Sequence, residues 1–185
     1  MCSNIYSKNV FRSIKLLILD VDGVLTDGKI TLSNSGDEYK NFNVKDGMGI
    51  VLLQKVGIRV AIITSKESNI VLNRLTSLGL NKEDIYQGQK NKIKAYQEIK
   101  EKYNLKDTNI AYMGDDLPDI AIMDKVFLSA APADCVSAVK KFANYICSSK
   151  GGYGAVRELC DFILKQEGLY EEVIKSYINN GELVF

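Results

Sequence analysis

The chain has 185 residues, with 24 lysines and arginines against 23 acidic residues and no histidine. This length suits a single domain with a sizeable core, and the near-neutral charge excludes a polyanion such as nucleic acid as the expected partner. Because histidine is absent, Ser-His, Cys-His and other histidine-base mechanisms are excluded, so catalysis has to use carboxylates, lysines and hydroxyls.

The four cysteines are scattered and form no CxxC pair. We therefore expect reduced thiols in place of a zinc site or a disulfide framework. Residues 1–8 lack the basic and apolar regions of a signal peptide, and no apolar run approaches the length of a membrane span. The sequence predicts a soluble, cytoplasmic protein with no membrane partner.

The first predicted element is the apolar run 16–19, which leads into Asp20, Val21, Asp22 and Gly23. Such a continuous run is typical of a strand buried on both faces of a parallel sheet, and ligands bind at the edge where such strands end. Two carboxylates this close are costly unless a cation or a proton neutralises them, so we expect a metal. The alternative is an ordinary tight turn.

A small hairpin is predicted next. Residues 29–33 and 38–44 alternate with a period of two, and the turn residues 34–37 join them. An apolar helix follows and ends at Gly57, with Asp46 as its expected N-cap. The hairpin is therefore expected to form a flap directly after the first two carboxylates.

The rest of the chain alternates strands with helices. Strands are predicted at 58–64, 84–87, 109–114, 126–129 and 145–147, and helices at 66–78, 93–103, 135–142 and 155–166. This alternation, without repeats or linkers, predicts an α/β fold with a doubly wound parallel sheet. We expect one domain over residues 1–185, whose apolar tail, 168–185, packs on a neighbouring subunit.

Polar side chains follow each of the first four predicted strands of this sheet. They are Asp20 and Asp22 after the first, Thr64 after the second, Lys92 after the third, and Asp115, Asp116 and Asp119 after the fourth. Taken singly, the threonine suits a turn cap and the lysine a solvated surface position. Together, hard oxygen ligands with one hydroxyl and one cation indicate a site for Mg²⁺ and a phosphate.

Phosphoryl transfer gives these residues distinct roles. Asp20 is expected to attack phosphorus and form an aspartyl-phosphate, while Asp22 protonates the leaving oxygen and later deprotonates the attacking water. Thr64 and Lys92 are expected to hold the transferring group by hydrogen bond and charge. Asp115 is expected to complete the metal site, with Asp116 and Asp119 binding through water or holding Lys92 in place.

Four segments, in this order, resemble the motifs of the haloacid-dehalogenase-like phosphatases. They are residues 20–28, residues 62–64, Lys92 and residues 114–119. The resemblance implies the roles above, and it implies that the metal is held by the Asp20 carboxylate, the Asp22 main-chain carbonyl and Asp115. It also implies the haloacid-dehalogenase core fold, which is Rossmann-like.

The spacing of the motifs leaves no room for a separate cap domain. Only the hairpin and one helix fit between Asp22 and Thr64. Residues 43–49, 86–89 and 152–158 resemble the capless 3-deoxy-D-manno-octulosonate 8-phosphate phosphatases, and the match runs from about residue 15 to 168. That family implies an Mg²⁺-dependent hydrolysis of an eight-carbon sugar-acid phosphate in lipopolysaccharide biosynthesis. It also implies a homotetramer in which a neighbouring subunit covers each active site.

The same resemblance implies a set of residues that line the substrate site. They are Asn43, Val44, Lys45, Asp46, Gly47, Lys66, Arg74 and Lys92. The chain departs from the family at Lys66, where Gly-Arg usually follows the motif threonine, and at Tyr153, where arginine is common. Lysine keeps the charge but loses the two-pronged geometry with which arginine binds a carboxylate.

Three alternatives remain open from the sequence. A phosphatase for nine-carbon sialic-type acid 9-phosphates has the same motifs. A phospho-receiver domain also places acids, a threonine and a lysine at strand ends, but its phosphorylated aspartate follows the third strand, where residues 87–89 contain no acid. An inactive oligomerisation module of a sugar-nucleotide synthetase is the third, and the complete set of motifs argues against it.

Overall fold

The computed structural model describes residues 14–184, and its centre is a six-stranded parallel sheet. The strand order is β5-β4-β1-β6-β7-β8, with bounds β1 Leu16–Leu19, β4 Arg59–Ile63, β5 Ile85–Tyr86, β6 Ile110–Met113, β7 Leu128–Ala131 and β8 Tyr145–Ile146. The sheet reverses its strand order beside β1, as a doubly wound sheet does. The predicted fold class is confirmed.

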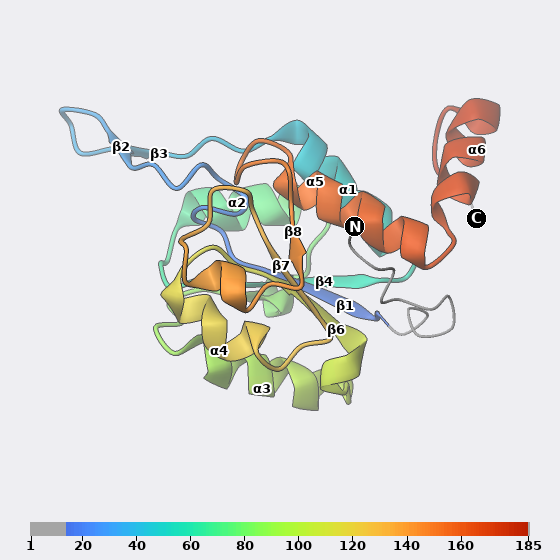
Figure 1. Ribbon diagram of the computed structural model, residues 1–185. Helices are drawn as coiled ribbons and strands as arrows, with labels where there is room; N and C mark the ends of the chain where they lie inside the picture. Colours follow the sequence, from blue (N-terminus) through green and yellow to red (C-terminus); the bar gives the residue numbers. More distant parts are fainter. Residues whose placement is uncertain (1–13, 185) are drawn as a thin grey trace.

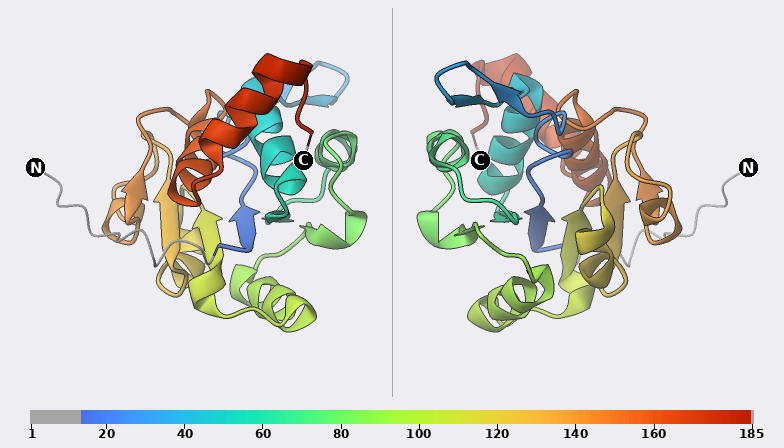
Figure 2. Two further views of the ribbon diagram at one scale, coloured as in Figure 1. Left: turned by 90° about the vertical axis from the view of Figure 1, so that its right-hand side faces the viewer. Right: turned by 90° about the vertical axis from the view of Figure 1, so that its left-hand side faces the viewer.

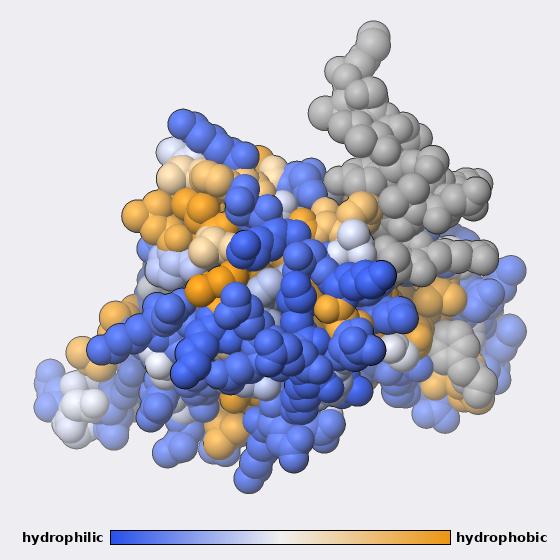
Figure 3. All heavy atoms as spheres, turned by 90° about the horizontal axis from the view of Figure 1, so that it is seen from below, coloured by the Kyte–Doolittle hydropathy of each residue, from blue (hydrophilic) through white to orange (hydrophobic). Residues whose placement is uncertain are grey.

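Helices cover both faces of the sheet (Figure 1). They are α1 Val44–Lys55, α2 Asn69–Ser77, α3 Lys92–Tyr103, α4 Ile120–Met123, α5 Ala155–Gln166 and α6 Tyr170–Asn180, with short 3-10 helices at Lys82–Asp84, Asp107–Asn109, Leu117–Asp119 and Val139–Lys141. Figures 1 and 2 show α1 and α5 on one face and α3 and α4 on the other. Figure 3 looks onto the α3 and α4 side, where hydrophilic residues cover most of the surface.

The alternation of side chains along each strand builds two separate cores. In β1, Leu17 and Leu19 pack into the core beneath α1 and α5, whereas Leu16 and Ile18 pack into the core of α3 and α4. All four side chains are fully buried. A strand buried on both faces needs a continuous apolar run, which is why this segment of the sequence was recognisable as a central strand.

The predicted flap is a two-stranded hairpin, β2 Thr31–Leu32 and β3 Glu38–Tyr39, which projects from the body of the molecule (Figure 1). Within residues 14–184, it is the only pair of strands outside the main sheet. It lies between β1 and α1, and no cap domain is inserted there. The prediction of a capless core is confirmed.

Two local predictions were wrong. The N-cap of α1 is Asn43, whose side chain accepts a hydrogen bond from the Lys45 amide at 2.9 Å, while Asp46 lies inside the helix. The second difference is at 135–142, where only Val139–Lys141 forms a 3-10 helix. There the backbone closes bonds between residues three apart and turns back to β8, so no longer helix forms.

The C-terminal tail forms α6, which packs partly against its own chain. Val173 and Leu183 are buried, but the side chains of Ile174, Ile178 and Val184 remain exposed. Figure 1 places α6 and the hairpin at opposite ends of the molecule. In the described part of the chain, no helix combines the length and hydrophobicity that a membrane crossing requires.

Candidate active site

The polar residues predicted at the strand ends meet in one cavity of about 290 Å³. Its lining consists of Asp20, Asp22, Gly28, Thr64, Ser65, Lys66, Lys92, Asp115, Asp116, Pro118 and Asp119. Parallel strands end at the same edge of a sheet, so residues far apart in sequence come together there. The sequence analysis did not assign Gly28, Ser65 or Pro118 to the site, although each is adjacent to a motif residue or lies inside a motif.

A larger cavity, of about 610 Å³, lies at the opposite edge of the sheet. Two of its charged groups are paired with each other: the Arg59 guanidinium lies 3.3 Å from Asp84, and it also lies 4.0 Å from the centre of the Tyr103 ring. This cavity contains a single carboxylate, Asp84, which is already paired, whereas the smaller cavity gathers Asp20, Asp22, Asp115, Asp116 and Asp119. We therefore place the chemistry in the smaller cavity.

Lys92 connects two carboxylates at the base of the site. Its ammonium nitrogen lies 2.9 Å from Oδ1 of Asp20 and 2.7 Å from Oδ1 of Asp119. Asp119 is fully buried, and it also accepts hydrogen bonds from the Tyr112 hydroxyl at 2.6 Å and from the amide of Asp115 at 3.0 Å. Asp119 thus fixes both Lys92 and the loop that carries Asp115.

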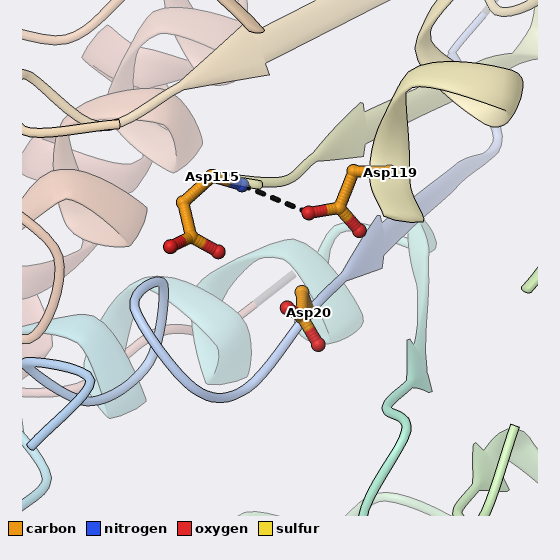
Figure 4. Close-up of side chains that lie close together, drawn as sticks. All are labelled: Asp20, Asp115 and Asp119. Carbon is orange, nitrogen blue, oxygen red and sulfur yellow. Dashed lines mark hydrogen bonds between the residues drawn. The ribbon is translucent and has the colours of Figure 1, made fainter. Parts of the chain in front are cut away.

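Three acidic side chains converge without enough positive charge to balance them. Carboxylate oxygens of Asp20, Asp115 and Asp119 lie within 4.8 Å of one another (Figure 4). Burial raises the pKa of Asp20 to about 7 although Lys92 opposes this shift, and burial together with the charge of Asp20 raises the pKa of Asp115 to about 7. Oδ1 of Asp115 is buried and has no hydrogen-bond partner.

This arrangement fits a hard divalent cation. A buried carboxylate oxygen without a partner costs free energy, and a bound cation would remove that cost. Oxygen ligands are those that Mg²⁺ prefers. Both oxygens of Asp119 already accept hydrogen bonds, Oδ1 from Lys92 and Oδ2 from the amide of Asp115, whereas Lys92 contacts Asp20 through Oδ1 alone. The carboxylates available to hold the ion are therefore those of Asp20 and Asp115. The role of the Asp22 carbonyl as a third ligand stays a prediction.

Glycine at position 23 lets the loop after β1 approach Asp115. Gly23 has φ +88°, and a Cβ there would lie 2.1 Å from Oδ2 of Asp115. Its amide donates to the Thr26 hydroxyl at 3.4 Å, and the amide of Gly28 donates to the same oxygen at 3.2 Å. Any side chain at Gly23 would therefore displace the carboxylate that is available for the metal.

Asp22 has a partner that the sequence analysis missed. The ammonium group of Lys40, which follows β3, forms an ion pair with Oδ1 of Asp22. Lys40 and Glu38 lie two residues apart in an extended segment, and therefore on the same face. This periodicity, together with the position of the hairpin directly after the first motif, was the only available signal.

The remaining predicted catalytic and binding residues divide into two groups. Thr64 and Lys66 line the cavity, and Thr64 is nearly fully buried after the end of β4. The other group does not line it. Arg74 packs against Gly47 in α1, and Lys45 lines a different cavity together with Tyr153.

The other predicted substrate-binding residues lie in and before the first turn of α1, outside the cavity. Asn43 caps α1, and Val44 is 76% exposed. The buried carboxylate of Asp46 accepts hydrogen bonds from the amides of Arg157 at 2.7 Å and Gly154 at 3.3 Å. The substrate-binding roles of Asn43, Val44, Lys45, Asp46, Gly47 and Arg74 stay predictions.

Comparison with known proteins assigns the family. A family profile for haloacid dehalogenase-like hydrolases matches residues 50–159. The chain is also 46% identical over 161 residues to the 3-deoxy-D-manno-octulosonate 8-phosphate phosphatase KdsC of Escherichia coli K12, covering 87% of this chain and 85% of that protein. The chain belongs to the haloacid dehalogenase-like hydrolases. Among them it groups with the phosphatases, which confirms the predicted enzyme class.

Solved structures of this phosphatase group agree with the fold. The Moraxella catarrhalis enzyme, solved in complex with magnesium, phosphate and KDO, has a TM-score of 0.88 and 35% identity and covers 92% of this chain and 97% of that one. The cobalt-bound enzyme from Haemophilus influenzae has a TM-score of 0.85 and 32% identity, with 91% and 99% covered. A phosphatase of this family is therefore favoured over the phospho-receiver and inactive-module alternatives.

Proposed function

We propose that this chain hydrolyses 3-deoxy-D-manno-octulosonate 8-phosphate to KDO and phosphate, with Mg²⁺ as cofactor. The observation that carries the chemistry is the pairing of a nearly buried Asp20 with Lys92 beside the unpartnered carboxylate of Asp115. The substrate follows from the relatives, which share 46% identity over most of the chain and act on this phosphate by name. The nine-carbon acid 9-phosphates are the competing substrates.

Asp20 is the proposed nucleophile. One of its oxygens bonds to phosphorus while the bond from phosphorus to the sugar oxygen breaks, which leaves an aspartyl-phosphate. The ion pair between Lys92 and Oδ1 fixes the orientation of the carboxylate in the cavity. Water then attacks the aspartyl-phosphate and releases phosphate, restoring Asp20.

The surrounding residues supply proton transfer and charge. Asp22 gives its proton to the leaving sugar oxygen and takes one from the attacking water in the second step. The Thr64 hydroxyl and the Lys92 ammonium bind the oxygens of the transferring group. When bound by Asp20, Asp115 and the Asp22 carbonyl, Mg²⁺ supplies positive charge that stabilises the phosphoryl oxygens.

Two measurements test this function. Phosphate release from the eight-carbon and nine-carbon acid phosphates should be compared in Mg²⁺ and in EDTA, and we expect kcat/KM to be higher for the eight-carbon substrate. Asp20→Asn should lower kcat by at least about 10³-fold, because the amide is a poor nucleophile. Undiminished hydrolysis by this variant contradicts the mechanism, and a preference for the nine-carbon substrate contradicts only the substrate.

The assembly and compartment of the protein are further parts of the proposal. We propose a homotetramer in which the tail, residues 168–185, packs on a neighbouring subunit. The exposed side chain of Ile178 borders an apolar groove of about 410 Å³ between α1, α5 and α6, which supports this contact. Sedimentation equilibrium of the wild type and of Ile178→Glu tests it, and an unchanged tetramer in the variant contradicts the role of the tail.

A cytoplasmic location is supported by the free cysteines. Cys135, Cys147 and Cys160 are buried and unpaired. Burial raises the pKa of each thiol, which keeps it protonated and unreactive. Reduced, buried thiols are typical of proteins from a reducing compartment. Fractionation of cells that express the tagged chain tests this location.

A further inference from the structure

The hairpin contributes a buried cation to the active site. Lys40 follows β3, and its side chain is only 2% exposed. Its ammonium group pairs with Oδ1 of Asp22 and lies 3.2 Å from Oε1 of Glu38. A lysine at the base of an exposed flap would normally extend into water, so its burial between two carboxylates is a specific arrangement.

Lys40 does not line the cavity that Asp22 enters. Its ammonium group contacts Oδ1 of Asp22, a residue that does line the cavity. The two ion-pair partners of the ammonium group are the carboxylates of Asp22 and Glu38, and neither Lys40 nor Glu38 lines the cavity. The geometry therefore argues against a direct contact between Lys40 and the phosphate.

We infer that Lys40 is a positioning residue for Asp22. Through this contact, the hairpin takes part in the proton transfers of the reaction. The inference rests on the proposed function, in which Asp22 transfers the proton. Lys40 binds one carboxylate oxygen, Oδ1, and so fixes the orientation of the carboxylate and the position of its other oxygen, Oδ2, relative to the leaving sugar oxygen. Glu38 is the second ion-pair partner of the Lys40 ammonium group.

Proton transfer to the leaving group matters only when that group is a strong base. As the bond from phosphorus to the sugar oxygen breaks, an alkoxide would form unless Asp22 delivers a proton to that oxygen. Nitrophenolate is a much weaker base and leaves without a proton. A misplaced Asp22 should therefore slow hydrolysis of a sugar phosphate far more than hydrolysis of p-nitrophenyl phosphate.

The test is kcat/KM of Lys40→Met on both substrates, because kcat/KM reports the steps up to departure of the leaving group. We expect a loss of about 10²-fold on the sugar phosphate and less than about 10-fold on p-nitrophenyl phosphate. The variant should lower kcat by a larger factor than it raises KM. Lys40→Arg, which keeps the charge, should recover most of it.

Matched variants separate positioning from folding. Lys29, at the start of the hairpin, pairs with Asp27 at 3.3 Å and is 74% exposed, so Lys29→Met removes a hairpin lysine without touching Asp22 and should leave both rates unchanged. Glu38→Gln loosens Lys40 while both catalytic aspartates stay, and should shift the ratio of the two rates in the same direction. This second variant decides the matter if Lys40→Met does not fold.

The outcomes distinguish this inference from the proposed function. Equal losses on both substrates, or a rise in KM alone, overturn the positioning role. Failure of the wild type to hydrolyse the eight-carbon phosphate overturns the proposed substrate instead. In that case, the loss of kcat/KM is compared between p-nitrophenyl phosphate and whichever alkyl phosphate the wild type hydrolyses.

Discussion

The ammonium nitrogen of Lys92 lies 2.9 Å from Oδ1 of Asp20 and 2.7 Å from Oδ1 of Asp119, and its side chain is 3% exposed. One buried cation therefore holds both the proposed nucleophile and the carboxylate that organises the neighbouring loop. A charge in this position is strongly coupled to its partners, because water screens it very little.

Replacing Lys92 by methionine should abolish activity and destabilise the fold. Removing one partner of a buried ion pair costs about 3–5 kcal/mol, since the remaining charge has no compensation. The free energy of unfolding in urea measures this. The control is Lys100→Met, because Lys100 pairs with Asp107 at a partly exposed site, where we expect less than about 1 kcal/mol. Equal losses in the two variants contradict the prediction.

Substituting Gly23 by alanine should weaken Mg²⁺ binding by at least about 10-fold, because its Cβ would lie 2.1 Å from Oδ2 of Asp115 and displace a ligand. Titration calorimetry with Mg²⁺ measures the affinity. Gly36 is a matched control with φ +89° and no atom within 4 Å of a Cβ. Gly36→Ala should cost about 1–2 kcal/mol of backbone strain and leave Mg²⁺ affinity unchanged. The same affinity in both variants is the opposing result.

Stabilisation by Mg²⁺ should increase with pH. The pKa values of Asp20 and Asp115 are raised from 3.8 to about 7, with burial the largest cause in both. A carboxyl with a raised pKa binds its proton more tightly in the folded state than in the unfolded chain. As pH rises from 3.8 to about 7, the metal-free protein therefore loses the stability that these bound protons supply. Mg²⁺ competes with the same protons and binds better once they have left.

The difference in Tm between Mg²⁺ and EDTA, measured at about pH 5 and about pH 8, checks this prediction. Taking the difference cancels the titration of carboxylates away from the site. We expect a clearly larger stabilisation at the higher pH, and we expect Asp115→Asn to lose most of it. A stabilisation that is equal at both pH values, or larger at pH 5, is inconsistent with metal binding by Asp20 and Asp115.

Asp46→Asn should lower stability by about 1–2 kcal/mol, because the carboxylate accepts hydrogen bonds from two amides at the start of α5. Urea unfolding measures the change. Asp37→Asn is the control, since Asp37 is exposed and bonds only to Ser33 and Ser35 in the hairpin turn. If Asp46→Asn instead raises KM and leaves stability unchanged, the predicted substrate-binding role is favoured.

The sequence by itself determined the sheet and most of the residues that line the candidate active-site cavity. An apolar run that ends in a carboxylate or a hydroxyl, as residues 16–19 do before Asp20, is a local pattern, and a parallel sheet brings every such end to one edge. For that reason the sequence alone predicts that Asp20, Thr64, Lys92 and Asp115 lie close together.

Only the tertiary structure decided which long-range partners these residues have. Lys40 reaches Asp22 from 18 residues away, and the carboxylate of Asp46 reaches the amide of Arg157 from 111 residues away. The periodicity of the hairpin shows only that Glu38 and Lys40 share a face, and it does not identify Asp22 as the partner; each pairing depends on how the hairpin and α5 pack. A local pattern predicts which face a residue occupies, whereas the packing of distant elements determines which group it meets there.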